Sequence, residues 1–291
     1  MSARVRKLFF AFLAMSLTSA ALPAMEWPLQ DATVVRNFGF NERGRPTVGV
    51  VLAGDGEVLA SGSGEVIFSF SGSNTASRFP STLGAWMAVD LGNGLISIYA
   101  RYYDADGPAP SRVDLGAPIA TAGASGWSTQ EGCYFMLFDR RERRWVNPAM
   151  IVTPFQDTLV PQIHGIQLLA EDGTLVNIVP GQSVIQGMYG IIVNASDALS
   201  GNRGNSLAPH RIISSVNGTE VGRLSLETIS VRDGVMLINR SAQVPARRVY
   251  APFPAFEAGE VWLNRGQAIL EIIVQDIAGN SSRTVAHIFV E

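Results

Sequence analysis

Asparagine-glycine and aspartate-glycine dipeptides recur along the chain, between short runs of β-branched or aromatic residues. Such dipeptides adopt positive φ readily, which is the backbone geometry that tight β-hairpin turns require. Helical periodicity is nearly absent after the first residues, so the sequence predicts an all-β protein of antiparallel strands. The dipeptides that we expect to form turns are Asp55–Gly56, Asn93–Gly94, Asp172–Gly173, Asn217–Gly218 and Asp233–Gly234. The predicted strands include Gly64–Phe70, Ala85–Asp90, Leu95–Tyr99, Val235–Ile238 and Ala268–Val274.

The first residues have the pattern of a secretory signal peptide. Arg4, Arg6 and Lys7 precede the apolar run Leu8–Met15, and small residues follow up to Ala24. We expect residues 1–24 to be removed and the mature protein to be exported, to the periplasm or elsewhere in the cell envelope. A transmembrane anchor is the alternative, but the apolar run is shorter than the roughly 20 residues that a membrane-spanning helix needs. No membrane span is therefore expected after cleavage.

The net charge, the cysteine content and the length of the chain indicate which partners it can bind and how its fold is stabilised. The formal charge of −3 becomes −6 once the three basic residues of the signal segment are removed, which argues against nucleic acid as a partner. Cys133 is the only cysteine, so the chain has no internal disulfide and must be stabilised by packing. The remaining chain of roughly 265 residues, rich in apolar side chains, is long enough for two cores of ordinary size.

A change of pattern divides the mature chain into two predicted domains. Residues 151–162 contain two prolines and no clear alternation of apolar and polar residues, which predicts a linker. Residues 163–291 contain short alternating strands separated by turns, which predicts an immunoglobulin-like β-sandwich. Within this domain Asp197 and Asp276 each follow a predicted strand. Both are expected to cap a turn, and calcium binding by either is the alternative.

Residues 25–150 carry a series of short, mostly glycine-containing segments that resembles the LytM-like, M23-type peptidoglycan endopeptidases. Their order and spacing carry the resemblance, since each segment alone is common in β-proteins. The resemblance implies a LytM-like antiparallel β core domain. The segments are Arg45–Leu52, Val58–Val66, Met87–Arg101, Val113–Ile119, Ala122–Gly126, Gly132–Asp139 and Val146–Pro148.

The resemblance also implies where a catalytic zinc site would lie. In that family, zinc is held by a histidine and an aspartate four residues apart around a glycine, and by the second histidine of a His-x-His strand. The first histidine of that strand, and a histidine after Tyr-Ala, serve the chemistry. Three protein ligands and a water make an open site in which zinc activates the water. The corresponding positions of this sequence hold Thr47, Val51, Arg101, Tyr134 and Met136.

None of these five side chains is a suitable ligand or acid–base group for a catalytic zinc site. The only histidines, His164, His210 and His287, all follow the predicted linker, and no paired-histidine motif is present. We therefore predict an emptied, degenerate zinc site, with no metal, no cofactor and no catalytic residue. The alternative is that residues 132–139 form an ordinary core strand that was never related to a zinc site.

The predicted function is that of a pseudoenzyme: a non-catalytic envelope protein that regulates or scaffolds peptidoglycan-processing machinery by protein contact. Its expected partners are cell-envelope proteins such as peptidoglycan hydrolases. Two alternatives remain open. One is a module that binds peptidoglycan without cleaving it, through a groove lined by Arg45, Tyr99, Arg101 and Tyr134. The other is an active metalloendopeptidase with an unusual site.

Overall fold

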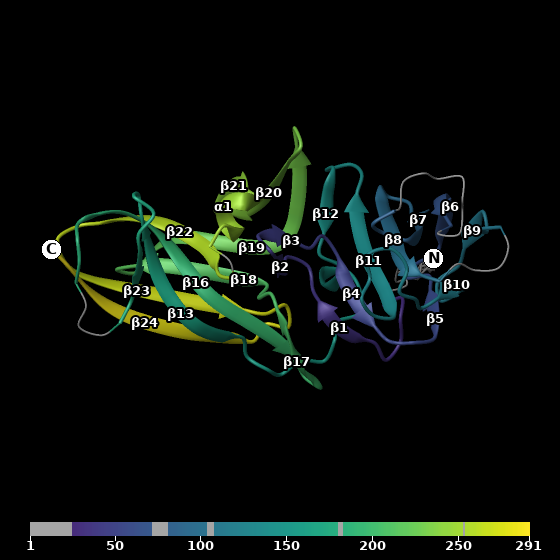
Figure 1. Ribbon diagram of the computed structural model, residues 1–291, viewed down its shortest axis with the longest axis horizontal. Helices are drawn as coiled ribbons and strands as arrows, with labels where there is room; N and C mark the ends of the chain where they lie inside the picture. Colours follow the sequence, from purple (N-terminus) through teal and green to yellow (C-terminus); the bar gives the residue numbers. More distant parts are fainter. Residues whose placement is uncertain (1–24, 72–80, 104–107, 180–182, 253) are drawn as a thin grey trace, which may run out of the picture.

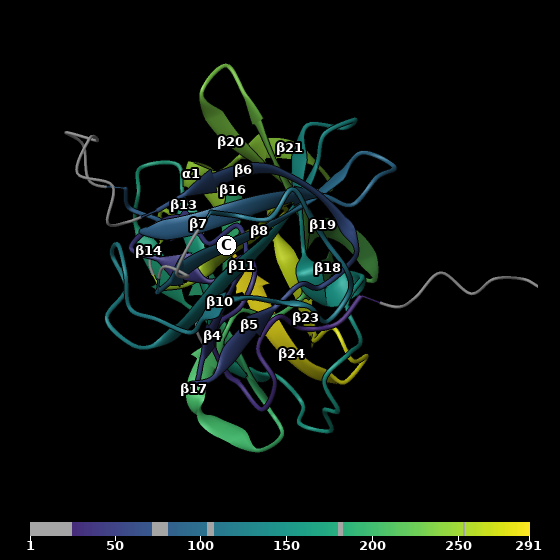
Figure 2. The same ribbon diagram turned by 90° about the vertical axis from the view of Figure 1, so that its right-hand side faces the viewer.

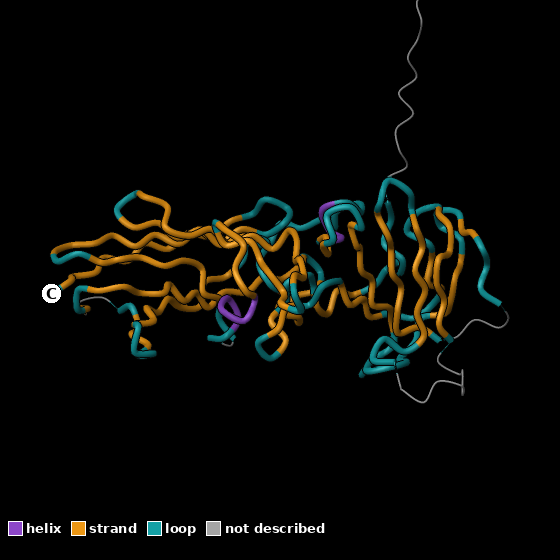
Figure 3. The backbone as a smooth tube through the Cα atoms, turned by 90° about the horizontal axis from the view of Figure 1, so that it is seen from above, coloured by secondary structure: helices purple, strands orange, loops and turns teal. Residues whose placement is uncertain are grey.

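The computed structural model describes residues 25–71, 81–103, 108–179, 183–252 and 254–291, and it confirms the all-β prediction. Among these residues the only helical segments are the 3₁₀ turn η1 (Pro148–Met150) and the short helix α1 (Ala246–Tyr250). Figure 3 shows that strands make up nearly all of the regular structure. No helix in the described part is long and apolar enough to cross a membrane. The predicted signal peptide, residues 1–24, lies outside the described residues.

The hairpin turns follow the chemistry of their dipeptides. Asn93, Asn217 and Asp233 have φ of 52°, 51° and 52°, and the glycine after each also has positive φ. Two successive residues with positive φ are typical of the type I′ turn, whose twist matches that of the strands it joins. These turns connect β7 (Ala85–Asp90) to β8 (Leu95–Tyr102), β18 (Arg211–Val216) to β19 (Thr219–Arg232), and β19 to β20 (Val235–Arg240).

The N-terminal region, residues 25–150, is built on antiparallel strands in the order β9-β6-β7-β8-β11-β12, with β4 on β11 and β1 on β4. Figure 2 views this region from its end, with β6, β7 and β8 side by side. Leu52, Tyr99 and Phe135 lie at the centre of its core. Its other strands are β1 (Thr33–Arg36), β2 (Asn41–Glu42), β3 (Arg45–Pro46), β4 (Val50–Ala53), β5 (Glu57–Leu59), β6 (Gly64–Phe70), β9 (Arg112–Val113), β10 (Pro118–Thr121), β11 (Gly132–Asp139) and β12 (Arg144–Val146).

The C-terminal region, residues 162–291, is a β-sandwich whose two sheets enclose one apolar core (Figure 1). One sheet contains β14, β13, β16, β17 and β22, and the other contains β15, β24, β23, β18, β19, β20 and β21. Ile191, Ile212 and Ile272 meet between them and are fully buried. The immunoglobulin-like assignment stays a prediction. The remaining strands are β13 (Gln162–Ala170), β14 (Leu175–Asn177), β15 (Ser183–Val184), β16 (Gly187–Leu199), β17 (Asn202–Leu207), β21 (Ala242–Pro245), β22 (Phe256–Leu263), β23 (Gly266–Gln275) and β24 (Ser281–Val290).

One sheet runs through both regions. β12 pairs with β11 on one side and with β19 on the other, with Trp145 opposite Ile229 as Cα partners. In Figure 1 these strands lie where the two regions meet. Among the described residues the combined sheet has 15 strands. The backbone hydrogen bonds of the N-terminal sheet therefore continue directly into the sandwich.

The segment between β1 and β4 packs into the core of the other region. Phe38 is only 1% exposed and belongs to the same apolar cluster as Leu226 and Tyr250 of the sandwich. Gly39, at φ 77°, leaves no room for a side chain, because an added Cβ would lie 2.7 Å from Leu226 Cδ1. The Tyr250 hydroxyl donates a buried hydrogen bond to the carbonyl of Gly39 at 2.7 Å. The two regions thus share a core as well as a sheet.

The predicted linker, residues 151–162, forms no strand before Gln162, but it is held to both regions. The ring of Phe155 stacks on Trp27 of the N-terminal region, with centroids 4.6 Å apart. Asp157 accepts hydrogen bonds from the backbone and hydroxyl of Ser200, and Ser282 donates to the carbonyl of Pro161. We call residues 151–162 the connector below. Whether the two regions are separable domains stays a prediction.

Candidate functional site

The strand pairing brings the predicted zinc-site positions together. Val51 on β4 is the Cα partner of Tyr134 on β11, and Tyr134 is in turn the partner of Ala100 on β8, next to Arg101. Met136 lies two residues along β11, on the same face of the strand as Tyr134. Positions from three separate segments of the sequence therefore meet on one face of the sheet.

Apolar packing fills the place where these side chains meet. Val51, Ala100, Tyr134 and Met136 are all buried and form one cluster. Gly49 lies against them so closely that an added Cβ would be 2.5 Å from Met136 Cγ. The remaining position is occupied by Thr47, whose hydroxyl donates to the carbonyl of Asn37 at 2.7 Å. None of these side chains offers the imidazole, thiolate or carboxylate donors by which proteins hold zinc.

Arg101 covers the outer side of this cluster. Its guanidinium carbon lies 4.7 Å from the centroid of the Tyr134 ring, in cation–π geometry. Trp86 pairs with Ala100 and Ala85 pairs with Tyr102, so Arg101 is an extra, bulged residue, and its φ of 71° is uncommon for a residue other than glycine. Burial raises the pKa of Tyr134 to about 12 and lowers the pKa of Arg101. At neutral pH the phenol is therefore uncharged, whereas the guanidinium keeps its charge.

A groove with a volume of about 750 Å³ opens over the cluster, and we call it the arginine groove. Its arginines outnumber its single carboxylate, Glu42, which is 2.9 Å from Arg36 in an ion pair. The groove therefore carries a positive charge, on a chain whose overall charge is negative. It is lined by Val35, Arg36, Glu42, Arg43, Arg45, Pro46, Thr47, Val48, Val51, Arg101, Trp127, Ser128, Thr129, Gln130, Tyr134 and Met236.

Two hydrogen-bond donors in the groove lack acceptors. Arg101 Nε and Gln130 Nε2 are buried and have no hydrogen-bond partner among the described residues. Buried donors in folded proteins are nearly always paired, so such orphans point to a missing acceptor. Guanidinium groups such as that of Arg101 pair most strongly with carboxylates.

Trp127 is a groove residue that the sequence reasoning missed. Its side chain is 74% exposed, which is unusual for so large an apolar group, and it lines the groove beside Ser128. The loop that carries it is held by Gly84 and Gly126, which approach each other so closely that neither leaves room for a Cβ. In the sequence, this loop could be recognised from the glycine-containing segment Ala122–Gly126, which directly precedes Trp127.

The expectation for Tyr99 is corrected by the structure. Tyr99 does not line the groove, because it lies on the opposite face of β8, where it is fully buried in the N-terminal core. Its hydroxyl accepts a hydrogen bond from the backbone N–H of Ser61 at 2.8 Å. Simple alternation places Tyr99 and Arg101 on the same face, but the bulge at Arg101 breaks that alternation. Arg45, Arg101 and Tyr134 do line the groove.

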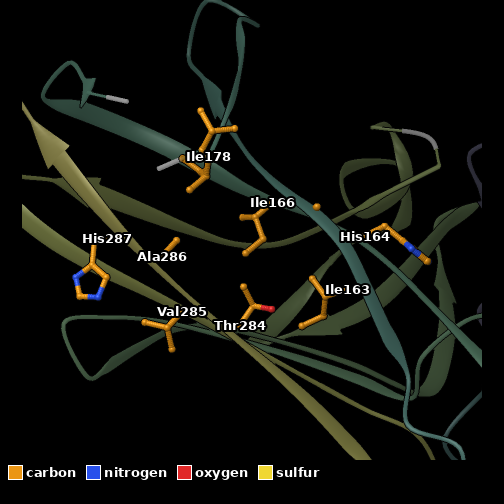
Figure 4. A pocket seen from close by; sticks show the side chains of 10 residues that line it. Ile163, His164, Ile166, Ile178, Thr284, Val285, Ala286 and His287 are labelled. Atoms are coloured by element: carbon orange, nitrogen blue, oxygen red, sulfur yellow. The ribbon is translucent and has the colours of Figure 1, made fainter. Parts of the chain in front are cut away.

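The histidines do not assemble into a metal site. His164 and His287 both line an apolar hollow of about 510 Å³ between β13 and β24, but Figure 4 shows them at opposite ends of it. His164 Nε2 is 2.7 Å from the hydroxyl of Ser196, and His210 Nε2 is 3.8 Å from Glu227. Among the described residues, the one group of potential metal ligands is Asp157, Asp197 and Asp276, which lies outside the groove.

Cys133 is not a candidate nucleophile. It is buried in the N-terminal core, and burial raises the pKa of its thiol to about 12. The thiolate is the reactive form of cysteine, so a thiol that stays protonated at neutral pH is inert.

Comparisons with known proteins complete the description of the site. A family model matches residues 160–291. The search of curated proteins found no match. Similar solved structures include the catalytic domain of a prophage-encoded M23 protein from Enterococcus faecalis (18% identity, 40% of this chain, 86% of that chain, TM-score 0.34). Another is the SpoIIQ–SpoIIIAH pore-forming complex (18% identity, 45% of this chain, 92% of that chain, TM-score 0.36). A third is lysostaphin from Staphylococcus simulans (14% identity, 92% of this chain, 92% of that chain, TM-score 0.35). These TM-scores are below 0.5, so the assignment of the site rests on the residues of this chain.

Proposed function

We propose that this chain is a non-catalytic, M23-like protein of the cell envelope, exported to the periplasm or another envelope compartment, which acts by binding. The observation that carries the proposal is the apolar cluster of Val51, Ala100, Tyr134 and Met136, together with the placement of Arg101 over it. A hydrolytic zinc site needs ligands and a bound water at this place, and these side chains supply neither ligands nor a base.

The ligand is a carboxylate-bearing chain, and it binds in the arginine groove. Arg45 is exposed and lines the groove, and so do Arg101 and Gln130, each of which has a buried donor without an acceptor among the described residues. Planar guanidinium groups bind carboxylates with two parallel hydrogen bonds, which gives geometric selectivity in addition to charge. An acidic segment of a partner protein fits this description, and the partners we propose are peptidoglycan hydrolases and their regulators.

A release assay on labelled peptidoglycan tests this proposal. Alone, the protein should release no more label than buffer does. Mixed with the envelope hydrolase it regulates, it should change the rate of release, and the Arg45→Ala variant should change that rate less. Arg112, which is also exposed but lies on β9 away from the groove, provides the matched control Arg112→Ala. Label released by the protein alone would contradict the proposal.

Peptidoglycan itself is the second candidate ligand, and Trp127 favours it. An exposed indole beside arginines is suited to an apolar sugar face next to the carboxylates of a stem peptide. If the groove binds cell wall, the protein should sediment with purified peptidoglycan. The Arg45→Ala and Trp127→Ala variants should then each bind at least about tenfold more weakly, since each loses a contact of about 1.5 kcal/mol.

A matched control shows whether a loss of sedimentation is specific to residues of the groove. Trp262 is likewise exposed but lies on β22 of the sandwich, so Trp262→Ala should bind like the parent protein. Tyr134→Ala is avoided because Tyr134 is buried and its removal would leave a cavity. Undiminished sedimentation of both groove variants would place the binding surface elsewhere on the molecule. A parent protein that stays in solution would leave protein contact as the function of the groove.

A further inference from the structure

Three carboxylates from three separate segments converge where the connector meets the sandwich. Asp157 belongs to the connector, Asp197 to β16, and Asp276 to the turn after β23. One carboxylate oxygen of each lies within 4.8 Å of an oxygen of the other two. Like charges this close repel one another strongly unless a cation or a proton is shared among them.

In the part of the chain that the structure describes, these three carboxylates have no direct ion-pair partner. Among the described residues, Asp157, Asp197 and Asp276 form no ion pair with arginine or histidine within 4.0 Å. The buried carboxylate of Glu257, by contrast, has the guanidinium of Arg240 against it. The three aspartates therefore lack the usual partner of a buried negative charge.

Asp197 provides a second observation, independent of the clustering. The residue is only 7% exposed, and its Oδ1 is buried without any hydrogen-bond partner. Asp197, whose carboxylate lies beside two others, thus has a buried acceptor without a donor.

The neighbouring groups hold the other two carboxylates in place without occupying all their lone pairs. Asp157 Oδ1 accepts from the backbone and hydroxyl of Ser200, both at 2.9 Å. The oxygens of Asp276 accept from the backbone and side-chain nitrogens of Asn280, at 2.8 and 2.7 Å. Each carboxylate oxygen can accept more than one hydrogen bond or coordinate a metal in addition. The cluster is thus positioned in advance and still able to bind.

We propose that Asp157, Asp197 and Asp276 bind one calcium ion. Every donor in the cluster is a carboxylate oxygen, which suits hard divalent cations and disfavours zinc or copper. Calcium takes oxygen ligands at about 2.3 to 2.6 Å, so oxygens around one ion can lie up to about 5 Å apart, which matches the observed spread. Asp157 is partly exposed, and this leaves an open side at which water completes the coordination.

The ion would fasten the connector to the sandwich. Asp157 is the only one of the three ligands that lies outside the sandwich, and Asn280 also donates to its backbone carbonyl at 3.3 Å. Binding that requires the connector in this position stabilises the folded arrangement by linkage. Calcium would therefore strengthen the junction between the two regions, independently of what the arginine groove binds.

Calcium titration of the full chain after removal of divalent ions with a chelator tests the proposal. Isothermal titration should show one calcium per chain, and the melting temperature should rise with calcium concentration. The Asp197→Asn variant keeps the shape of the side chain but removes one charge, and it should bind calcium at least about tenfold more weakly. Asp157→Asn, on the partly exposed connector, should weaken binding similarly and guards against a folding defect in the first variant.

Asp233→Asn is the matched control, because Asp233 is exposed in a hairpin turn at φ 52°, a conformation that asparagine also tolerates. This variant should bind calcium like the parent chain. Absence of binding heat and of any melting shift up to about 10 mM calcium, above the range of weak extracellular sites, would overturn the proposal. Parent-like binding by both Asp197→Asn and Asp157→Asn would also overturn it.

Discussion

Replacing Phe38 by alanine is expected to lower the free energy of unfolding of the chain by about 3 to 5 kcal/mol. Phe38 comes from the N-terminal region, yet its ring is buried in the core of the sandwich beside Leu226 and Tyr250. Its truncation removes apolar burial and leaves a cavity where the two regions meet. Equilibrium denaturation in urea, followed by tryptophan fluorescence and by circular dichroism, measures the change.

Phe289 provides the matched control for Phe38. It is 54% exposed on β24, so Phe289→Ala should change stability by no more than about 0.5 kcal/mol. If the two regions unfold as one unit, the two spectroscopic probes should report the same transition in the parent protein. Equal, small effects of the Phe38 and Phe289 substitutions would contradict a core shared between the regions.

The second large effect is expected for Glu257→Gln, at about 3 kcal/mol of destabilisation. Glu257 on β22 and Arg240 on β20 are both buried and in direct contact, and no other acidic residue of the described ranges lies as close to that guanidinium. Removing the carboxylate charge leaves the arginine charge buried with only Glu260, at 3.5 Å, for partial compensation. The same denaturation experiment measures this loss.

An exposed pair of the same chemistry serves as the control. Glu220 and Arg223 are in contact at the surface, and ion pairs of this kind contribute at most about 1 kcal/mol. Glu220→Gln should therefore leave stability nearly unchanged. A loss for Glu257→Gln no larger than that for Glu220→Gln would show that water or Glu260 compensates the buried charge of Arg240.

Local chemistry explains which parts of the structure could be predicted from the sequence. Asn217 and Asp233, each before a glycine, determine hairpin turns through their own backbone preferences, and the predicted turns formed there. The predicted site positions meet in space because their segments occur in a recognisable order around β4, β8 and β11. The turns are determined by a few neighbouring residues, and the site positions could be located from the order of the motifs.

The parts that could not be predicted depend on contacts distant in sequence. Nothing around Phe38 indicates that its ring packs beside Tyr250, because a buried phenylalanine looks the same whichever core receives it. The bulge that places Arg101 on the opposite face from Tyr99 has no glycine to mark it. Asp157 lies in a segment without periodicity, so its meeting with Asp197 and Asp276 appears only in three dimensions.

The filled site also has an energetic consequence for catalysis. Thr47, Val51 and Met136 offer no anionic or imidazole donor, so the proposed function expects no free energy of zinc binding at this place. Without the ion there is no activated water and no Lewis acid to polarise an amide carbonyl. Under the proposed function, both contributions to barrier lowering are expected to be lost together.

Zinc content and peptidoglycan hydrolysis, measured on the same purified protein, test the non-catalytic assignment most directly. We predict far less than one zinc per chain by mass spectrometry. We also predict no release of labelled fragments above the buffer control, with or without added zinc. Stoichiometric zinc accompanied by chelator-sensitive cleavage would contradict the assignment, and would mean that groups outside the arginine groove, such as His164, His210 or His287, supply the missing ligands.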